Sequence, residues 1–386
     1  MKKTGVSTLF LVLLMTAIAA LLLVKPCCAA QTAAGPVPPD FILEKSLPGE
    51  DPYWMYRPQF SPDAKHAACF ASSSHRIVIW NLETAKIEKE IEESVHGMPG
   101  LDGYTYSNDG KMLILIYRDL PVVWLDIASE KIVKKIDANA DPKKVWDFTF
   151  SPDQKVLALA TNTGIKLYDV DKGVQTKTFL AGKAVSGAEI CYYRTEKGQL
   201  VRLLGYGLYL NKDSQFKDVA GIIDLDSGSV RPVLNDVPKD KVKKGDMTLI
   251  WVTFERGGGY MLVQYTILPP TVKAGVYLVN TRTGKFLVNH DLDQMTLSYN
   301  TYYLWKPYYG YLVNTKDMRQ NPYKISTEFL VVTKDEGLKV IDTKKEDKYP
   351  LQSITVSSDQ KWALIATKKS QQDPSKVFLY RIVPKK

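Results

Sequence analysis

Histidine and cysteine are the residue types that this sequence has least of. Its 386 residues include 4 histidines and 4 cysteines. The histidines are not spaced as metal ligands from one another or from a cysteine, and no His-x-x-x-His or Cys-x-x-Cys occurs after residue 30. They are His66, His75, His96 and His290. The scarcity argues against redox enzymes that hold haem or copper through several histidines, so we expect no metal and no cofactor.

Motifs for nucleophilic catalysis and for phosphate binding are also missing. There is no Gly-x-Ser-x-Gly elbow, and no histidine is placed by the sequence to serve a serine nucleophile. Gly257 to Gly259 lies between two strand patterns, whereas a phosphate loop leads from a strand into a helix, so we interpret it as a β-turn. These absences favour a protein that is not an enzyme.

Two acidic segments resemble the start of a calcium loop. They are Asp169-x-Asp171-x-Gly173 and Asp224-x-Asp226-x-Gly228. Neither has the bidentate acid at the distance that a calcium loop requires. Both fall at a hairpin position that recurs along the chain, so we predict turns.

Charge is mildly positive and evenly spread. Lys and Arg number 51 against 42 Asp and Glu, a net charge of +9, and no run of five or six like charges occurs. Such a distribution does not indicate a nucleic-acid binder. The hydrophobic fraction of 45% is ample for a packed core and argues against disorder.

The N-terminus has the pattern of an export signal. Lys2 and Lys3 precede an uncharged, mainly apolar stretch from Gly5 to Val24, and small residues follow at Cys28-Ala29-Ala30. We predict a signal peptide over residues 1–30 and an Ala-, Gly- and Pro-rich linker over 31–40. The Lys-Lys start is typical of bacteria.

Two alternatives to cleavage stay open. The apolar stretch is long enough to span a bilayer, which would make it a retained anchor and the protein's one contact with a membrane. Lipidation at Cys27 or Cys28 is the other, although Lys25 and Pro26 match a lipobox poorly. In each case most of the chain lies outside the cytoplasm, in the periplasm, at the cell surface or in the medium.

The two cysteines that would survive cleavage are Cys69 and Cys191. Each sits inside an apolar strand pattern, in repeats that we expect to lie far apart. We predict buried thiols rather than a disulfide.

A turn motif recurs along the chain and is followed within two residues by lysine. Its clear copies are Phe60-Ser61-Pro62-Asp63, Tyr106-Ser107-Asn108-Asp109, Phe150-Ser151-Pro152-Asp153 and Val356-Ser357-Ser358-Asp359. Weaker copies begin at Arg194 and Phe254. Ser, Pro and Asp in this order suit a tight reversal between two strands. The first copies are about 45 residues apart, and the long final gap leaves room for one degenerate repeat.

A second motif is an apolar strand that ends in Asp or Asn. It occurs at Ile79-Trp80-Asn81, Trp124-Leu125-Asp126, Leu167-Tyr168-Asp169, Ile222-Ile223-Asp224, Leu278-Val279-Asn280 and Val340-Ile341-Asp342, with Leu379-Tyr380-Arg381 as a variant. Both motifs count seven repeats. Each repeat predicts four strands, because a second hairpin follows the Asp or Asn.

Seven such units predict an all-β fold, a seven-bladed β-propeller of four-stranded antiparallel blades over residues 41–386. The last unit has too few residues for a fourth strand. Phe41 to Lys45 reads as a strand without a partner. We therefore predict that residues 41–46 complete the last blade and close the ring.

The repeats resemble those of the WD40 and YVTN-like propeller families. The resemblance is carried by Phe60-Ser61-Pro62-Asp63 with Ile77 to Thr84, and by Phe150-Ser151-Pro152-Asp153 with Ile165 to Val170. It is clear in the first three units and the last, and loose in units four to six. The Gly-His dipeptide of eukaryotic WD40 repeats is absent, so the match is better to exported bacterial propellers, which often serve as binding platforms. Propellers host many functions, so the resemblance implies the fold and little else.

Aromatic and basic residues gather in the irregular units. The segment between units five and six contains Tyr299, Tyr302, Tyr303, Trp305, Lys306, Tyr308, Tyr309 and Tyr311, and the segment between units four and five contains Lys239, Lys241, Lys243 and Lys244. We expect both to be loops on one face, together with long loops at Tyr206–Val219 and Thr266–Gly275. They either cover irregular blades or form a recognition patch, since Tyr and Trp anchor protein interfaces.

The sequence thus favours a non-catalytic protein that binds or scaffolds another protein through this face. An anionic polysaccharide is a second candidate partner, which would make the protein a glycan or ligand sensor. A propeller hydrolase or lactonase with a metal in its central channel is the competing enzyme class.

Overall fold

The structure, a computed structural model, describes sixteen segments of the chain. They are residues 40–49, 55–71, 74–92, 101–117, 121–137, 145–210, 218–234, 247–254, 258–267, 273–292, 301–304, 309–317, 324–333, 337–341, 351–368 and 374–383, with backbone alone at 56, 102, 273–274 and 367–368 and between 286 and 354. The chain divides into two compact units, Met1–Val37 and Pro38–Lys386, and every described residue belongs to the second. The predicted signal peptide, residues 1–30, lies outside the described residues. Across the described segments, no helix that could cross a membrane occurs.

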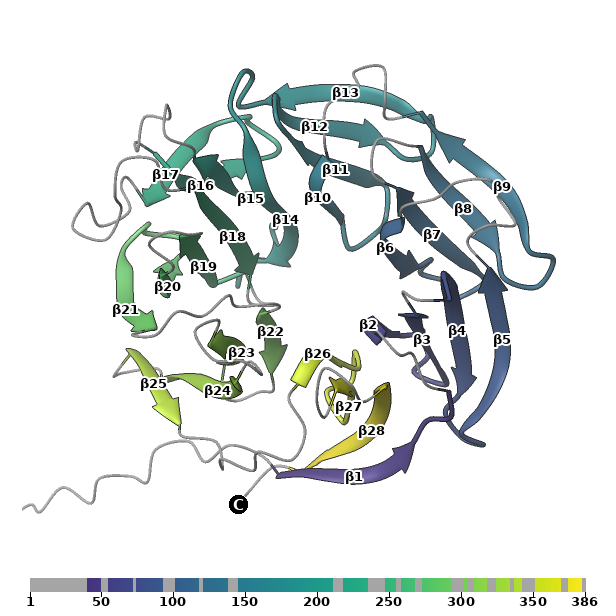
Figure 1. Ribbon diagram of the computed structural model, residues 1–386. Coiled ribbons are helices and arrows are strands. Elements are labelled where there is room, and N and C mark those ends of the chain that lie inside the picture. The colour runs from purple at the N-terminus through teal and green to yellow at the C-terminus, as the bar shows by residue number, and fades with distance from the viewer. Residues whose placement is uncertain are drawn as a thin grey trace, which may run out of the picture. The chain divides into compact units, whose positions relative to one another are not determined.

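All described elements are β-strands, and they pair as antiparallel four-stranded units in a propeller-like arrangement (Figure 1). The first three units are consecutive along the chain. Their strands are β2 (Met55–Phe60), β3 (His66–Ala71), β4 (Arg76–Asn81) and β5 (Lys86–Glu92); β6 (Leu101–Tyr106), β7 (Met112–Tyr117), β8 (Val122–Asp126) and β9 (Lys131–Ile136); and β10 (Val145–Phe150), β11 (Val156–Thr161), β12 (Gly164–Asp169) and β13 (Val174–Phe179). The predicted order of strands within a repeat is confirmed in all three.

The next two units share one sheet. They are β14 (Val185–Arg194), β15 (Leu200–Leu210), β16 (Ala220–Asp224) and β17 (Val230–Leu234), then β18 (Thr248–Phe254), β19 (Tyr260–Ile267), β20 (Lys273–Asn280) and β21 (Phe286–Leu292). The end of β15 pairs with the start of β18, through Tyr209 opposite Leu249 and Leu210 opposite Thr248. The repeats predict separate blades here, and the structure joins them.

Glycines explain why these two units approach so closely. A Cβ at Gly207 would overlap the carbonyl oxygen of Ile250, and a Cβ at Gly187 would lie 2.8 Å from the Cα of Trp251. Because neither position has a side chain, β14 and β15 lie directly against β18. The predicted loop Tyr206–Val219 is therefore wrong in its first part, since β15 continues to Leu210, and the predicted loop Thr266–Gly275 is likewise shortened by β19 and β20.

The sixth unit corrects two further expectations. Its strands are β22 (Thr301–Leu304), β23 (Tyr309–Asp317), β24 (Lys324–Thr333) and β25 (Gly337–Ile341). Val340 and Ile341 end the fourth strand and not the third. The prediction placed them on the third strand because alternating apolar residues look alike in both strands. Much of the aromatic segment forms the hairpin β22–β23, where Tyr303 pairs with Tyr311, rather than a loop between units.

The predicted pairing of the N-terminal strand with the C-terminal unit is confirmed. The sheet order is β1 (Asp40–Ser46), β28 (Ser375–Val383), β27 (Trp362–Lys368) and β26 (Leu351–Val356). β1 runs along β28 at the edge of this sheet (Figure 1), one residue earlier than the sequence predicts. The pair is reinforced by an ion pair of 2.5 Å between Arg381 Nε and Glu44 Oε1.

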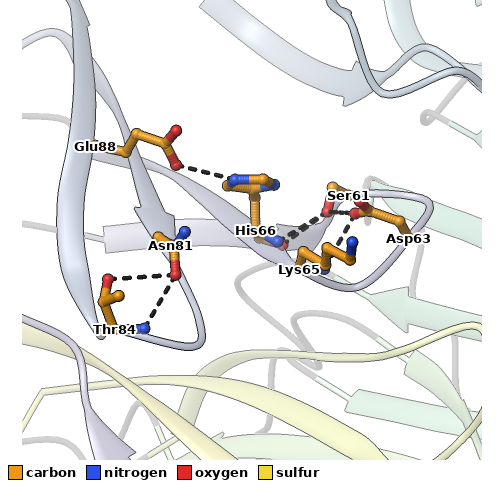
Figure 2. Close-up of polar contacts among 7 residues, drawn as sticks. All are labelled: Ser61, Asp63, Lys65, His66, Asn81, Thr84 and Glu88. Atoms are coloured by element: carbon orange, nitrogen blue, oxygen red, sulfur yellow. Dashed lines mark hydrogen bonds and ion pairs between the residues drawn. The ribbon is translucent and has the colours of Figure 1, made fainter.

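The serine–aspartate turn has the same geometry in every clear copy. In Figure 2 the Ser61 hydroxyl donates to Asp63 at 2.6 Å and accepts the N–H of His66 at 2.9 Å, while Asp63 accepts the N–H of Lys65. Three further copies repeat these bonds at Ser107, Ser151 and Ser357. In the second copy the Ser107 hydroxyl and the Lys111 N–H lower the pKa of Asp109. The motif is thus a reversal locked by its own side chains.

The second motif forms a side-chain-capped hairpin. The side-chain oxygen of Asn81 accepts the N–H and the hydroxyl of Thr84, as Figure 2 shows, and Asp126 does the same for Ser129. At the calcium-like segments, Asp169 Oδ1 accepts the N–H of Lys172, and Asp224 Oδ1 accepts the N–H of Ser227. The prediction of turns at these segments is confirmed.

Neighbouring units share hydrophobic clusters. Side chains of β3 to β5 pack with β6 to β8, those of β7 to β9 with β10 to β12, and those of β11 and β12 with β14 to β20. The first unit also packs against β27 and β28. Cys69 and Cys191 are buried in two different clusters, as predicted. Farther along, β21 contacts β25, and β22 contacts β26.

A basic residue on the outer strand links each of three units to the next. Lys45, Lys89 and Arg231 occupy equivalent positions, opposite Leu379, Ile79 and Ile222. The cations donate to paired carbonyls at the hairpin of the neighbouring unit. These acceptors are Leu82 and Glu83 for Lys45, Ile127 and Ala128 for Lys89, and Thr281 and Arg282 for Arg231. We call these contacts the outer cation links.

Replacing Lys89 by Met tests an outer cation link. The variant loses two charged hydrogen bonds and the ion pair with Glu130, so we expect it to reduce the free energy of unfolding by about 1–2 kcal/mol. Chemical denaturation measures the change. Lys86→Met, on the same strand at an exposed position, should stay within about 0.5 kcal/mol of the wild type. Equal effects of the two variants would contradict the link.

Candidate functional site

The predicted recognition patch is only partly within the described residues. Tyr302 and Tyr303 lie on β22 and Tyr309 on β23, with their backbone alone described. The other members, Tyr299, Trp305, Lys306, Tyr308, Lys241, Lys243 and Lys244, lie outside the described residues. The patch stays a prediction, and the site below is built from described side chains.

In several units the first strand contains a bulge at its second residue. The register shifts between Leu101 and Gly103 in β6, between Val145 and Asp147 in β10, and between Val185 and Gly187 in β14. The third unit therefore has Trp146 at its bulge. A bulge leaves one residue out of the ladder and redirects its side chain, and bulges are frequent beside functional sites.

Trp146 forms an exposed aromatic platform with residues of the fourth and fifth units. Its ring stacks on Tyr209 with centroids 5.0 Å apart and planes 16° apart, and its indole N–H donates to Asn162. The Tyr209 hydroxyl lies 3.0 Å from the sulfur of Met247. Trp146 is 37% exposed and Met247 41%. Most large apolar side chains are buried, so two exposed ones beside a tyrosine mark a surface suited to contact.

Asp147 follows Trp146 and connects two units. Its Oδ2 accepts the N–H of Ala188 on β14 at 3.1 Å, and its Oδ1 accepts the N–H of Phe148. Asp147 as a whole is half-buried, and the burial of its carboxylate raises its pKa to about 6, against the lowering effect of the Ala188 N–H and of the Arg57 charge. Asp147 thus acts as a link that titrates near neutral pH.

The other first strands are joined by similar bonds, which we call the inner links. The Gln59 amide donates to the carbonyl of Tyr104 at 2.8 Å, and the N–H of Phe254 donates to Glu189 at 2.7 Å. The Ser186 hydroxyl accepts the N–H of Ile250 at 2.9 Å and donates to its carbonyl at 2.7 Å. The acids of the inner strands therefore bind backbone amides of the adjacent unit.

Arg57 reaches across the second unit toward β10. A Cβ at Gly103 would overlap the guanidinium and the ring of Phe148, so the absence of a side chain there leaves the passage open. The guanidinium lies 5.8 Å from the centre of the Phe148 ring, and its charge lowers the pKa of Asp147. The first and third units thus place a cation over an aromatic ring, with the Asp147 carboxylate near enough for the charge to lower its pKa.

His66 and Ser61, although close together, do not form a nucleophilic pair. His66 directs its ring toward Glu88, with Nε2 at 2.9 Å from the carboxylate, and it meets Ser61 through its backbone N–H (Figure 2). The Ser61 hydroxyl is buried and is engaged in the turn. The same turn forms where Met112, Val156 or Trp362 replaces the histidine, so its role is structural.

Metal-binding groups were searched for over the described residues alone. There, no three His, Cys, Asp or Glu side chains come together as a metal site. The predicted absence of a cofactor stays a prediction.

Sequence reasoning missed the platform because its members are far apart in the chain. Trp146 and Tyr209 belong to different repeats, and nothing in the local pattern of either indicates stacking. The signal that was available is positional: a tryptophan occupies the second residue of a first strand, where a bulge recurs.

Comparison with known proteins places no family name on the chain. No protein-family model matches it, and no curated protein matches its sequence. Among solved structures, the chain is similar to hydrazine synthase of Kuenenia stuttgartiensis, with 14% identity, 69% of this chain and 74% of that chain covered, and a TM-score of 0.48. A likeness this distant carries no argument about function.

Asp147→Asn tests the titrating link. Because the folded pKa of about 6 exceeds the unfolded value of 3.8, the folded state binds more protons between these pH values, and stability falls as pH rises through 6. Asparagine keeps an oxygen for the Ala188 N–H and has no charge to bury. We expect the free energy of unfolding of the variant, relative to that of the wild type, to be about 1–3 kcal/mol higher at pH 7.5 than at pH 4.5. Denaturation of both proteins at both pH values measures this change. A difference that is independent of pH would contradict the assignment.

Proposed function

We propose that the chain is an exported, non-catalytic, seven-bladed β-propeller that binds another protein through the face carrying the Trp146 platform. The observation that carries the proposal is the exposed stack of Trp146 on Tyr209 beside Met247. Each part of the proposal has its own support.

Ring closure is supported by contacts between successive units. Shared clusters, paired strands or strand contacts join each unit to the next, from the first to the seventh. The seventh unit in turn contacts the first, since β2 lies against β26 and β27. A closed ring removes most exposed sheet edges, which otherwise invite aggregation.

A binding role is supported by the composition of the platform. Trp, Tyr and Met are enriched in interface cores, and Trp and Tyr are frequent among the residues that dominate binding energy. Three successive units contribute to the platform, so a rigid scaffold positions it. In sequence, Lys241, Lys243 and Lys244 shortly precede Met247, which favours a partner with acidic groups.

A non-catalytic role is supported by what the described inner acids do. Asp147 and Glu189 accept backbone N–H groups of the adjacent unit. These bonds give both acids a structural role, which favours a non-catalytic protein.

Export is supported by the N-terminal sequence. We expect protein recovered from the periplasm or medium of a bacterial host to begin at Gln31, as measured by intact mass and N-terminal sequencing. Recovery in the membrane pellet with residues 1–30 intact would indicate the anchor instead. Full-length protein in the cytosol would contradict export.

The double variant Trp146→Ser, Tyr209→Ser tests the binding face. After a partner is captured from native envelope extract and purified, its dissociation constant should rise at least about tenfold for the variant, because anchor aromatics each contribute a large share of binding energy. Val133→Ser is the matched control, since Val133 is 58% exposed on the outer strand β9, away from the platform strands. If the double variant binds like the control, the platform is not the interface.

A further inference from the structure

Arg57 adopts a backbone conformation that its residue type disfavours. Its φ is +55°, in the left-handed region, and it precedes Pro58. A bulky residue in this region is an outlier, and a following proline restricts it further. Such strain persists where the surroundings impose it, and it is concentrated at functional sites.

An insertion in β2 produces this conformation. The ladder passes from Tyr56 to Gln59 on β2 while β3 passes from Phe70 to Ala68, so Arg57 and Pro58 stand outside the pairing. The matching bulges in β6 and β10 also add one residue, but they skip no residue on the partner strand. The bulge in β2 directs the Arg57 side chain toward Gly103 and Phe148, away from its own unit.

Neighbouring residues hold the arginine in place. The Tyr104 hydroxyl, buried in the core, donates to the Arg57 carbonyl at 2.5 Å. Gly103 leaves the passage for the side chain, and the Phe148 ring lies beneath the guanidinium. Three residues on two other strands therefore position one arginine side chain. A cation that merely faced solvent would need no such contacts.

The charge of Arg57 is not cancelled by a close acid in the described part of the chain. Among the side chains that the structure describes, which do not include that of Asp102, no carboxylate lies within the 4.0 Å of an ion pair with its guanidinium, and Asp147 acts on it at longer range. The side chain keeps partial contact with solvent, as does every residue of β10 after Val145. A guanidinium presented in this way is suited to bind an oxyanion in a forked geometry.

We propose that Arg57, supported by Phe148, is a binding site for an oxyanion, and in particular for a carboxylate of the protein partner. The inference rests on the proposed function for the source of the anion, because Asp147 joins this site to the platform residue Trp146. A free small carboxylate is the other source of the same chemistry, and the test separates the two.

The first arm of the test uses acetate with the full mature chain. The Nε–Hε resonance of Arg57, identified by its loss in Arg57→Gln, should shift saturably with sodium acetate and not with sodium chloride of equal ionic strength. Arg202 is the matched internal control, because its guanidinium also lies 5.8 Å from an aromatic ring, that of Tyr192, but is already paired with Asp226 at 3.4 Å. Its resonance should not shift.

The second arm uses the purified partner. Arg57→Gln should weaken its binding at least about tenfold, with Arg57→Lys intermediate and Arg202→Gln unchanged. Gly103→Ala, which displaces the guanidinium without removing its charge, should weaken binding as well. Because it keeps the charge, it tests the site even if Arg57→Gln lowers stability.

The outcomes separate the two proposals. Weaker partner binding identifies the carboxylate as the partner's, and an acetate shift with unchanged partner binding identifies a free anion. If neither arm responds, the oxyanion site is wrong. In that case the proposed binding face is still supported if the double variant Trp146→Ser, Tyr209→Ser binds the partner more weakly. If acetate binds but the double variant binds the partner normally, the binding face alone is wrong.

Discussion

The arrangement of this protein depends on hydrogen bonds that run from side chains of one unit to the backbone of the next. The first strand of a sheet has a free edge, and unpaired N–H groups there are costly when they are buried. Asp147, Glu189 and Ser186 accept such N–H groups from the following unit. These N–H groups have their hydrogen-bond acceptors only when the neighbouring unit is in place, so the stability of each unit depends on its neighbour. The outer cation links repeat the same logic at the other end of the sheets.

These links also explain why the candidate sites lie where they do. The first strands meet both their own sheet and the adjacent unit, and the bulges of β2 and β10 take residues out of the ladder there. The residues released from the ladder are Arg57 and Trp146. The Arg57 side chain points across the inner strands and the Trp146 side chain points toward solvent. The bulges thus produce the two features that are suited to binding.

Much of the fold depends on residues that are close together in the sequence. Ser61 with Asp63, and Asn81 with Thr84, form turns from neighbouring residues alone, so the sequence predicts them correctly in several copies. The pairing of β1 with β28 was also predictable, because one unit lacked a strand and one strand lacked a unit.

Long-range features were not predictable in the same way. Gly207 indicates a loop when read locally, and only the position of Ile250 reveals that it allows two units to share a sheet. Val340 and Ile341 have the alternation of any strand, so their assignment to the third strand was wrong. The platform joins Trp146 to Tyr209 across two repeats, and the position of the Arg57 guanidinium depends on Gly103 and Phe148. Each of these depends on which residues of different units come together, and a single sequence does not contain that information in local form.

The N-terminal strand β1 belongs to the C-terminal sheet and thereby brings the two ends of the described chain together. Hydrogen exchange at the amides of residues 40–46, followed by mass spectrometry, tests it most directly. We predict that the β1 amides bonded to β28 are protected to the same extent as those of β27 and β28, and that all of them are lost together as denaturant is added. Exchange of residues 40–46 at the rate of an unstructured peptide, while β27 and β28 stay protected, would contradict the account.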